Sequence, residues 1–142
     1  RETVRQHTKI CSMKLDEEST AQLQYAVRNH YWYQWYLDDL PVWGMVGEIS
    51  SSDNETPEAN SEGEALVYTH KKFSISFNGE RIIQVNLTSE NPITLGDGTQ
   101  LDFTYSVDWV PTEQTFTRRF DRYLDYDFFE HQVRSHVRPL AN

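Results

Sequence analysis

The sequence has little cysteine, few basic residues and no long apolar run, and each shortage removes a class of function. Cys11 is the one cysteine, whereas a zinc site needs about four ligands, usually in close Cys or His pairs. No apolar run approaches the roughly 18 residues of a membrane helix. The 13 Lys and Arg residues stand against 22 Asp and Glu, a net charge of −9, which disfavours binding to nucleic-acid phosphates. We therefore expect no metal site, no nucleic acid and no membrane span within these residues.

The signatures of common enzymes are also missing. The sequence has no Gly-rich phosphate loop, no nucleophile elbow and no HExxH motif. Its five histidines are scattered, and only His131 and His136 lie close to each other. These absences assign no catalytic residue and no cofactor. The 142 residues are nevertheless enough for one domain with a real core.

Two groups of carboxylates were weighed as candidate sites. A group of acids with a histidine can hold a hard cation. Such a group near the C-terminus consists of Asp121, Asp125, Asp127, Glu130 and His131. Arg118, Arg119 and Arg122 are interleaved with it. The interleaved arginines favour a helix surface of ion pairs instead. Asp38-Asp39 could be a general acid and base, but adjacent residues point in different directions, which favours a turn.

No Lys or Arg occurs between Arg28 and Lys71, while acids accumulate there. Residues 50–64 are mostly Ser, Asp, Asn, Glu, Pro and Gly with no large apolar side chain, which predicts a solvated acidic loop. A site for a cation or a basic partner is the second interpretation. The same loop contains Asn54 in an Asn-x-Thr triplet, and Asn86 begins a second one. Both are candidate glycosylation sites if the domain enters the secretory pathway.

Aromatic residues are abundant in residues 30–48, and they pose the main question of this sequence. Such rings carry a large apolar area with a polar tip, so they either fill the core or face a partner. The order of the chain favours the core, with Pro41 and Gly44 setting a turn between a helix and the β-region. The six rings are the candidate binding aromatics: Tyr31, Trp32, Tyr33, Trp35, Tyr36 and Trp43.

The first half of the chain predicts an extended segment and then a helix. Asp16 can cap a helix whose first turn is acidic, and an apolar stripe containing Leu23 and Val27 follows at helical spacing. Residues 31–36 fit either a strand or a continued helix. Residues 42–49 read as a strand, in which Gly44 and Gly47 indicate a bulge or a close backbone approach.

The second half reads as β-structure. Asn78-Gly79 separates two alternating segments and predicts a hairpin. Turns are expected at Asn91-Pro92 and at residues 96–98, and residues 101–109 alternate as a strand with one buried face. Residues 116–124 read as a last strand or as a loop turning into a short helix. The expected fold is mainly β, an antiparallel sandwich-like or curled sheet with one packed N-terminal helix.

A series of sequence motifs, in the same order along the chain, resembles one known family. The first motif contains Asp38-Asp39-Leu40-Pro41 and Trp43-Gly44, and the series continues to the end of the β-region. The matching residues are 29–48, 68–73, 77–83, 85–90, 105–109, 119–125 and 128–131. They resemble the nonaspanins, the transmembrane 9 superfamily, also called endomembrane protein 70, and look closest to its member 3 type.

This resemblance implies a non-enzymatic role. It implies a non-cytosolic domain before nine membrane spans, located on the lumenal side of Golgi and endosomal membranes and linked to membrane-protein sorting. The partners would be membrane-protein cargo, contacted by spans outside this sequence. A lumenal domain that binds glycans or another ligand is the alternative.

The resemblance also implies boundaries. Residues 1–131 would be a partial non-cytosolic domain. Residues 132–142 would be a divergent tail, because the family continues there into its first membrane helix. Cys11 would form a disulfide with a family cysteine upstream of Arg1.

Overall fold

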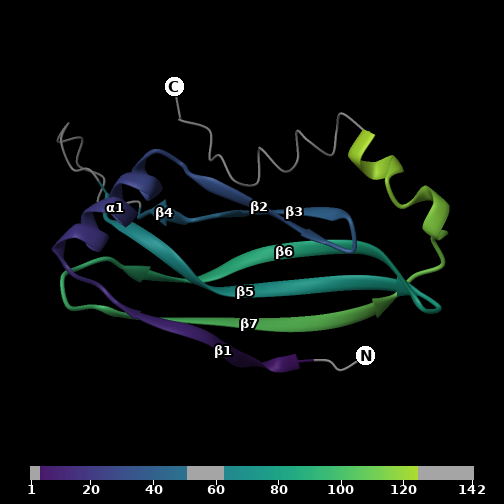
Figure 1. The fold of residues 1–142 in the computed structure, drawn as a ribbon, viewed down its shortest axis with the longest axis horizontal. Helices are drawn as coiled ribbons and strands as arrows, with labels where there is room; N and C mark the ends of the chain where they lie inside the picture. The colour runs from purple at the N-terminus through teal and green to yellow at the C-terminus, as the bar shows by residue number, and fades with distance from the viewer. Residues whose placement is uncertain (1–3, 51–62, 125–142) are drawn as a thin grey trace, which may run out of the picture.

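The computed structural model describes residues 4–50 and 63–124, and most of them lie in strands (Figure 1). The strands are β1 (Val4–Lys14), β2 (Trp32–Leu37), β3 (Leu40–Met45), β4 (Gly47–Ile49), β5 (Ala65–Asn78), β6 (Arg81–Thr94) and β7 (Gln100–Pro111). One α-helix, α1 (Glu17–Arg28), and two 3-10 helices, η1 (Phe116–Arg118) and η2 (Asp121–Leu124), complete the described chain. The predicted mainly β fold with an N-terminal helix is confirmed, and none of these helices has the length and hydrophobicity of a membrane span.

The main sheet has five strands and contains one pair that the sequence did not predict. β5 is flanked by β6 on one edge, and by β4 and then β7 on the other, while β1 completes the sheet beyond β7. The pairing of β5 with β7 is parallel, whereas every other pairing is antiparallel. The expectation of purely antiparallel strands is wrong here, because β7 crosses to the far edge of β5 instead of pairing with β6.

Helix α1 covers one end of this sheet, at the left of Figure 1. The Asp16 side chain accepts a hydrogen bond from the Ser19 backbone, and the Ser19 side chain accepts one from the Asp16 backbone, which is a capping box. Glu17 and Glu18 lie at the positive end of the helix dipole, and Arg28 lies at its negative end. The predicted cap at Asp16 is confirmed. Aliphatic side chains form the core at this end: Leu15, Val27, Ala65, Val67, Leu95 and Leu101.

A separate hairpin, β2–β3, lies over the sheet beside β6 (Figure 1). Residues 31–36 are thus mostly strand, and the helical alternative is wrong. The turn is Asp38-Asp39, where both residues have positive φ, 49° and 64°, as a tight two-residue hairpin requires. Pro41 and Gly44 lie inside β3 and do not set the turn, which corrects that expectation. A second core cluster joins the hairpin to the sheet through Leu40, Val42, Ile75 and Val85.

Both glycines that follow the hairpin turn permit close backbone approaches, as predicted. A Cβ on Gly44 would overlap the Tyr33 hydroxyl, and one on Gly47 would overlap the Leu66 carbonyl. The second approach allows β4 to pair with the start of β5, directly beneath α1.

The remaining turns are confirmed in part. β5 and β6 form the expected hairpin, but its turn residues are Gly79 and Glu80, one position later than Asn78-Gly79, because Asn78 pairs with Arg81. Asn91-Pro92 is not a turn: both residues lie within β6, where the Asn91 side chain donates to the Thr69 hydroxyl.

Gly98, with φ of 78°, lies in the turn expected at residues 96–98. Residues 116–124 form the short helices η1 and η2, so the helical alternative holds for that segment. Most of the acidic loop, residues 51–62, and the tail, residues 132–142, lie outside the described residues.

Candidate contact surface on the aromatic hairpin

The hairpin has an inner and an outer face, and aromatic rings occupy both. Alternation along a strand places successive side chains on opposite faces. The inner residues of β2 are Tyr33, Trp35 and Leu37, and those of β3 are Leu40, Val42 and Gly44. The outer residues are Trp32, Gln34, Tyr36, Pro41, Trp43 and Met45.

Most of the six candidate rings are exposed, which contradicts the expectation that they fill the core. Tyr36 is 69% exposed, Trp32 60%, Tyr31 50% and Trp35 43%, whereas Tyr33 and Trp43 are half-buried. The physical reason is that the aliphatic residues Leu40 and Val42 form the buried contact of the hairpin with the sheet. The outer rings of Trp32 and Tyr36 remain in solvent, whereas the outer ring of Trp43 lies beside Tyr123 with centroids 6.2 Å apart.

The inner rings are fixed against β5. The Trp35 ring stacks on Phe73 with centroids 6.3 Å apart and planes 18° from parallel. The Lys71 ammonium lies 4.8 Å from the Tyr33 centroid and 5.6 Å from that of Trp35, a cation–π arrangement. These contacts hold β2 in place, so the exposed rings of the same strand project from a fixed support.

The tip of the hairpin is tied to the segment after β7. The Arg119 side chain is only 4% exposed, and its Nη1 donates to Asp38 Oδ2 at 2.8 Å and to the Ile82 carbonyl at 3.1 Å. The Arg119 guanidinium also lies 4.1 Å from the Phe116 centroid and 5.0 Å from that of Phe120. Asp38 therefore acts as the partner of a buried cation, and this engagement leaves Asp38-Asp39 without the paired arrangement of a general acid and base.

Sequence reasoning missed the role of Arg119. It placed Arg119 on an ion-paired helix surface, and that interpretation is confirmed only for its neighbours: Arg118 pairs with Asp121 at 3.0 Å in an exposed position. The signal for Arg119 was its position between Phe116 and Phe120, because an arginine flanked by rings is suited to cation–π burial. Four members of that C-terminal group lie outside the described residues: Asp125, Asp127, Glu130 and His131.

A second polar group lies where the sequence showed only scattered histidines. His7 on β1 stacks on His70 on β5 with ring centroids 3.7 Å apart. The His70 ring nitrogens bond the hydroxyls of Thr104 at 2.7 Å and Ser106 at 3.0 Å. Burial, reinforced by the charge of His7, lowers the pKa of His70 below its ordinary value. Across residues 4–50 and 63–124, His, Cys, Asp and Glu side chains form no group of three that could hold a metal ion.

Two of the three candidate modification sites lie among the described residues. Cys11 is exposed on β1. Asn86 is half-buried on β6, and its Oδ1 accepts a hydrogen bond from Arg122 at 3.3 Å. Asn54 lies outside the described residues. Cys11 and Asn86 thus lie on strands of the main sheet and not on the hairpin itself.

Comparison with known proteins places the chain. The sequence profile described as Endomembrane protein 70 matches residues 2–142. This chain belongs to the endomembrane protein 70 family. An Arabidopsis thaliana relative named Transmembrane 9 superfamily member 3 is 34% identical over 93% of this chain. A Dictyostelium discoideum relative named Putative phagocytic receptor 1b is 30% identical over 96% of it, and a Bos taurus relative named Transmembrane 9 superfamily member 1 is 32% identical over 94%.

Two facts limit what family membership transfers. The chain spans only 22–23% of the length of these three relatives, so most of each protein has no counterpart in residues 1–142. No solved structure matches the chain. The structure of this endomembrane protein 70 chain therefore describes the fold of one segment of such a protein. The exposed aromatic hairpin belongs to that segment.

Proposed function

We propose that this chain is part of the lumenal, non-cytosolic domain of a multi-span endomembrane protein that acts in sorting membrane proteins through the Golgi and endosomes. The observation that carries the proposal is the family match over residues 2–142, together with relatives that are named for the transmembrane 9 superfamily. The membrane-protein cargo would be bound by the parent's membrane spans. The domain would act without catalysis, as a binding and scaffolding module.

The hairpin supplies the contact surface in this proposal. Trp32 and Tyr36 lie on its outer face and are among its most exposed rings, and Trp and Tyr are enriched where proteins meet partners because they carry apolar area and a polar tip. The Arg119–Asp38 pair and the Trp35–Phe73 stack hold this surface on the sheet. A preformed surface loses little conformational entropy on binding.

The test uses the full-length parent protein in cells that lack their own copy. Replacing Trp32 and Tyr36 with Ala should lower delivery of membrane cargo to the cell surface, while the parent remains at its normal level and location. Ile10→Ala is the control, because Ile10 is 52% exposed on β1 rather than on the hairpin. Unchanged delivery in the double variant would remove the hairpin from the function. Normal delivery in cells lacking the whole protein would refute the sorting role itself.

Lumenal placement has an independent test in the two sequons, Asn54 and Asn86. If the domain faces the lumen, deglycosylation of the parent should reduce its mass, and Asn54→Gln or Asn86→Gln should remove part of that reduction. Asn86 is the less accessible acceptor because it is half-buried. Two results together would contradict the lumenal assignment. The parent would carry no glycan in this domain, and an antibody added to the cytosolic side would bind an epitope placed in it.

A lumenal domain that binds a glycan or another ligand is the second candidate, and the exposure of Trp32 and Tyr36 favours it. Exposed rings stack on the apolar faces of sugars. Titration of the chain with oligosaccharides, followed by the NMR signal of the Trp32 indole N–H, would show a saturable shift that Trp32→Ala removes. Oligosaccharides that leave this signal unchanged at millimolar concentration would exclude glycans as the ligand.

A further inference from the structure

The outer edge of β2 is an unpaired strand edge. β2 pairs only with β3, in the register Trp32–Met45 to Leu37–Leu40. Leu37 and Leu40 flank a two-residue turn, so they exchange backbone hydrogen bonds with each other. From that pair onward, hydrogen-bonded and non-hydrogen-bonded residue pairs alternate along the hairpin. The Tyr31 carbonyl, which accepts from Val46 at 3.1 Å, continues the same alternation. The odd-numbered residues of β2 therefore bond to β3, and the N–H and C=O groups of the even-numbered residues point away from it.

The outward groups belong to Trp32, Gln34 and Tyr36. In the described parts of the chain no backbone hydrogen bond reaches them. Strand β3, rather than β2, makes the main contact of the hairpin with the sheet, through β6. Strand β2 reaches the sheet through the side chains of Tyr33 and Trp35 on β5, while Trp32, Gln34 and Tyr36 along its edge are exposed.

This edge lacks the features that protect the other edges. Proteins block unpaired edges with charges, prolines, kinks or very short strands. β2 has the sequence Trp-Tyr-Gln-Trp-Tyr-Leu, with no charge, proline or glycine. The other strands with a free edge each carry such a feature: Lys9 and Lys14 in β1, Pro41 in β3, the three-residue length of β4, and Arg81, Glu90 and Pro92 in β6.

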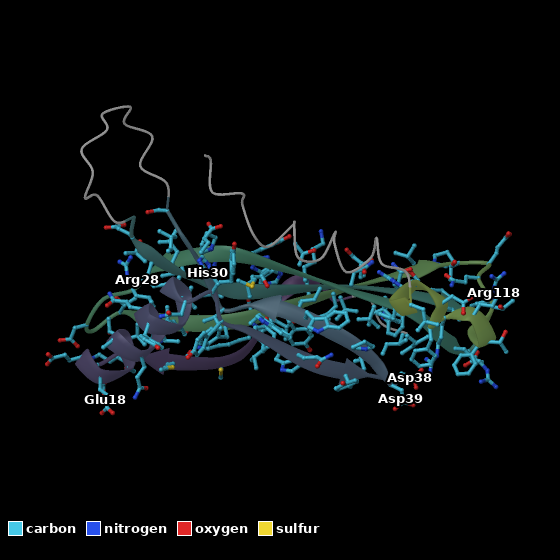
Figure 2. The ribbon with its side chains drawn as sticks, turned by 90° about the horizontal axis from the view of Figure 1, so that it is seen from above. Glu18, Arg28, His30, Asp38, Asp39 and Arg118 are labelled. Atoms are coloured by element: carbon cyan, nitrogen blue, oxygen red, sulfur yellow. The ribbon has the colours of Figure 1, made fainter. Side chains whose placement is uncertain are left out.

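The charges at the two ends of β2 indicate what pairs with it. Asp38 and Asp39 lie at the hairpin tip, whereas Arg28 at the end of α1 lies near the other end of the strand, as Figure 2 shows. Antiparallel pairing of two β2 strands places the acidic tip of each beside the basic end of the other. Parallel pairing would place like charges together.

We propose that two copies of this chain associate by antiparallel pairing of their β2 edges about a two-fold axis at Gln34. Gln34 then faces Gln34 of the second copy, and Trp32 of each faces Tyr36 of the other. All three facing positions have outward N–H and C=O groups, so each pair exchanges both backbone hydrogen bonds. The facing aromatic residues add a cross-strand contact on the outer face. This inference is independent of the sorting role.

The first test measures association of the chain by sedimentation equilibrium at physiological salt. Gln34→Lys places two like charges on the two-fold axis and should raise the dissociation constant at least about tenfold. Gln22→Lys is the matched control: it makes the same exchange on the exposed surface of α1, beside Glu18, and should leave association unchanged. A chain that stays monomeric at concentrations of hundreds of micromolar refutes the proposal, and so does a dimer that Gln34→Lys leaves intact.

The second test fixes the register and does not depend on the strength of association. Residues that face each other in a hydrogen-bonded antiparallel pair have Cα atoms about 5.5 Å apart, within the range of disulfides. In a Cys11→Ser background, Gln34→Cys should oxidise to a disulfide-linked dimer, whereas Gln22→Cys should not. A failure of Gln34→Cys to crosslink faster than Gln22→Cys, with circular dichroism showing both variants folded, would overturn the proposed axis.

The charge arrangement has its own variant. Asp39→Asn removes one charge of the acidic tip and keeps a residue that accepts the positive φ of 64°. Association should weaken by about two- to fivefold, and the difference from the wild-type chain should vanish at high salt. Association that strengthens on removal of this acid would exclude the antiparallel arrangement.

Discussion

Two elements cover the same sheet in different ways. Helix α1 buries aliphatic residues such as Val27 against β4 and β5, and the fully buried residues of the core that it closes are aliphatic. The hairpin β2–β3 buries Leu40 and Val42 but presents Trp32 and Tyr36 to solvent. Its tip is held by an ion pair in addition to the apolar packing of Leu40.

The difference indicates that α1 contributes mainly to the stability of the fold, whereas the hairpin also presents a surface for contact with a partner. A helix stripe directed at a sheet places its apolar residues in one core, whereas a two-stranded hairpin over a sheet has one covered face and one open face. Aromatic residues on the open face gain little from folding. Their presence is better explained by a partner, and substitutions at the two covers should therefore have unequal consequences.

The largest effect is expected in the core beneath α1. Leu101→Ala removes a side chain with no exposed surface and should lower the free energy of unfolding by about 2–5 kcal/mol, measured by urea denaturation followed by circular dichroism. Leu124→Ala, at a position that is 84% exposed, should change it by less than about 0.5 kcal/mol. Equal losses at both positions would remove the distinction between core and surface.

The hairpin tip should show an intermediate effect. Asp38→Asn removes the charge that pairs with Arg119 and should destabilise the fold by about 1–2 kcal/mol, less than for a fully buried pair because Asp38 is half-exposed. Asp39→Asn is the control, since both residues have positive φ but the recorded ion pair belongs to Asp38. If the two variants unfold at the same urea concentration, the ion pair does not hold the tip.

The His7–His70 pair predicts a dependence on pH. The lowered pKa of His70 means that the folded chain binds this proton more weakly than the unfolded chain does, so its stability is complete above the ordinary pKa of 6.5 and is lost as the pH falls below it. The charged groups around His70 are His7, Glu90, Lys72 and Lys71. The slope for one proton cannot exceed about 1.4 kcal/mol per pH unit.

His70→Gln should flatten this dependence in unfolding curves measured between pH 7 and pH 5, because glutamine can still bond the Thr104 and Ser106 hydroxyls but does not titrate in this range. His30→Gln, at an exposed position, should keep the slope of the wild-type chain. A slope that persists unchanged in His70→Gln would assign it to other groups.

The smallest effect on stability is expected on the open face of the hairpin. Trp32→Ala and Tyr36→Ala should each change the free energy of unfolding by less than about 0.5 kcal/mol, because both rings are largely in solvent. Thermal unfolding of the two variants measures this directly. A loss comparable to that of Leu101→Ala would mean that the rings belong to the core after all.

Local signals in the sequence predicted most of the elements. Asp16 followed by two acids indicated the start of α1, and alternation in residues 101–109 indicated β7. Gly44 and Gly47 indicated close approaches that the structure contains. The first two predictions succeeded because each depends on neighbours within one turn or one strand, and the glycines succeeded because a missing side chain is itself a local signal.

Some turn positions were wrong locally, but the failures that concern the candidate surface involve contacts between distant segments. Aromatic residues occupy both faces of β2, so alternation could not tell which rings would be covered. The edge of β5 that β7 would join has no local signal, and neither does the pairing of Arg119 with Asp38. The candidate surface was therefore located correctly in the sequence, while its exposure became known only from the fold.

The Arg119–Asp38 pair joins residues 81 positions apart, and this separation has a consequence during synthesis. At about 5–20 residues per second, roughly 4–16 s pass between the appearance of Asp38 and that of Arg119. Throughout that interval the hairpin tip lacks its ion pair, and the edge of β2 can pair with any extended chain nearby. The nascent protein should therefore depend most on chaperones before its last 3-10 helices emerge, and a stall between residues 40 and 119 should be the most damaging to its folding.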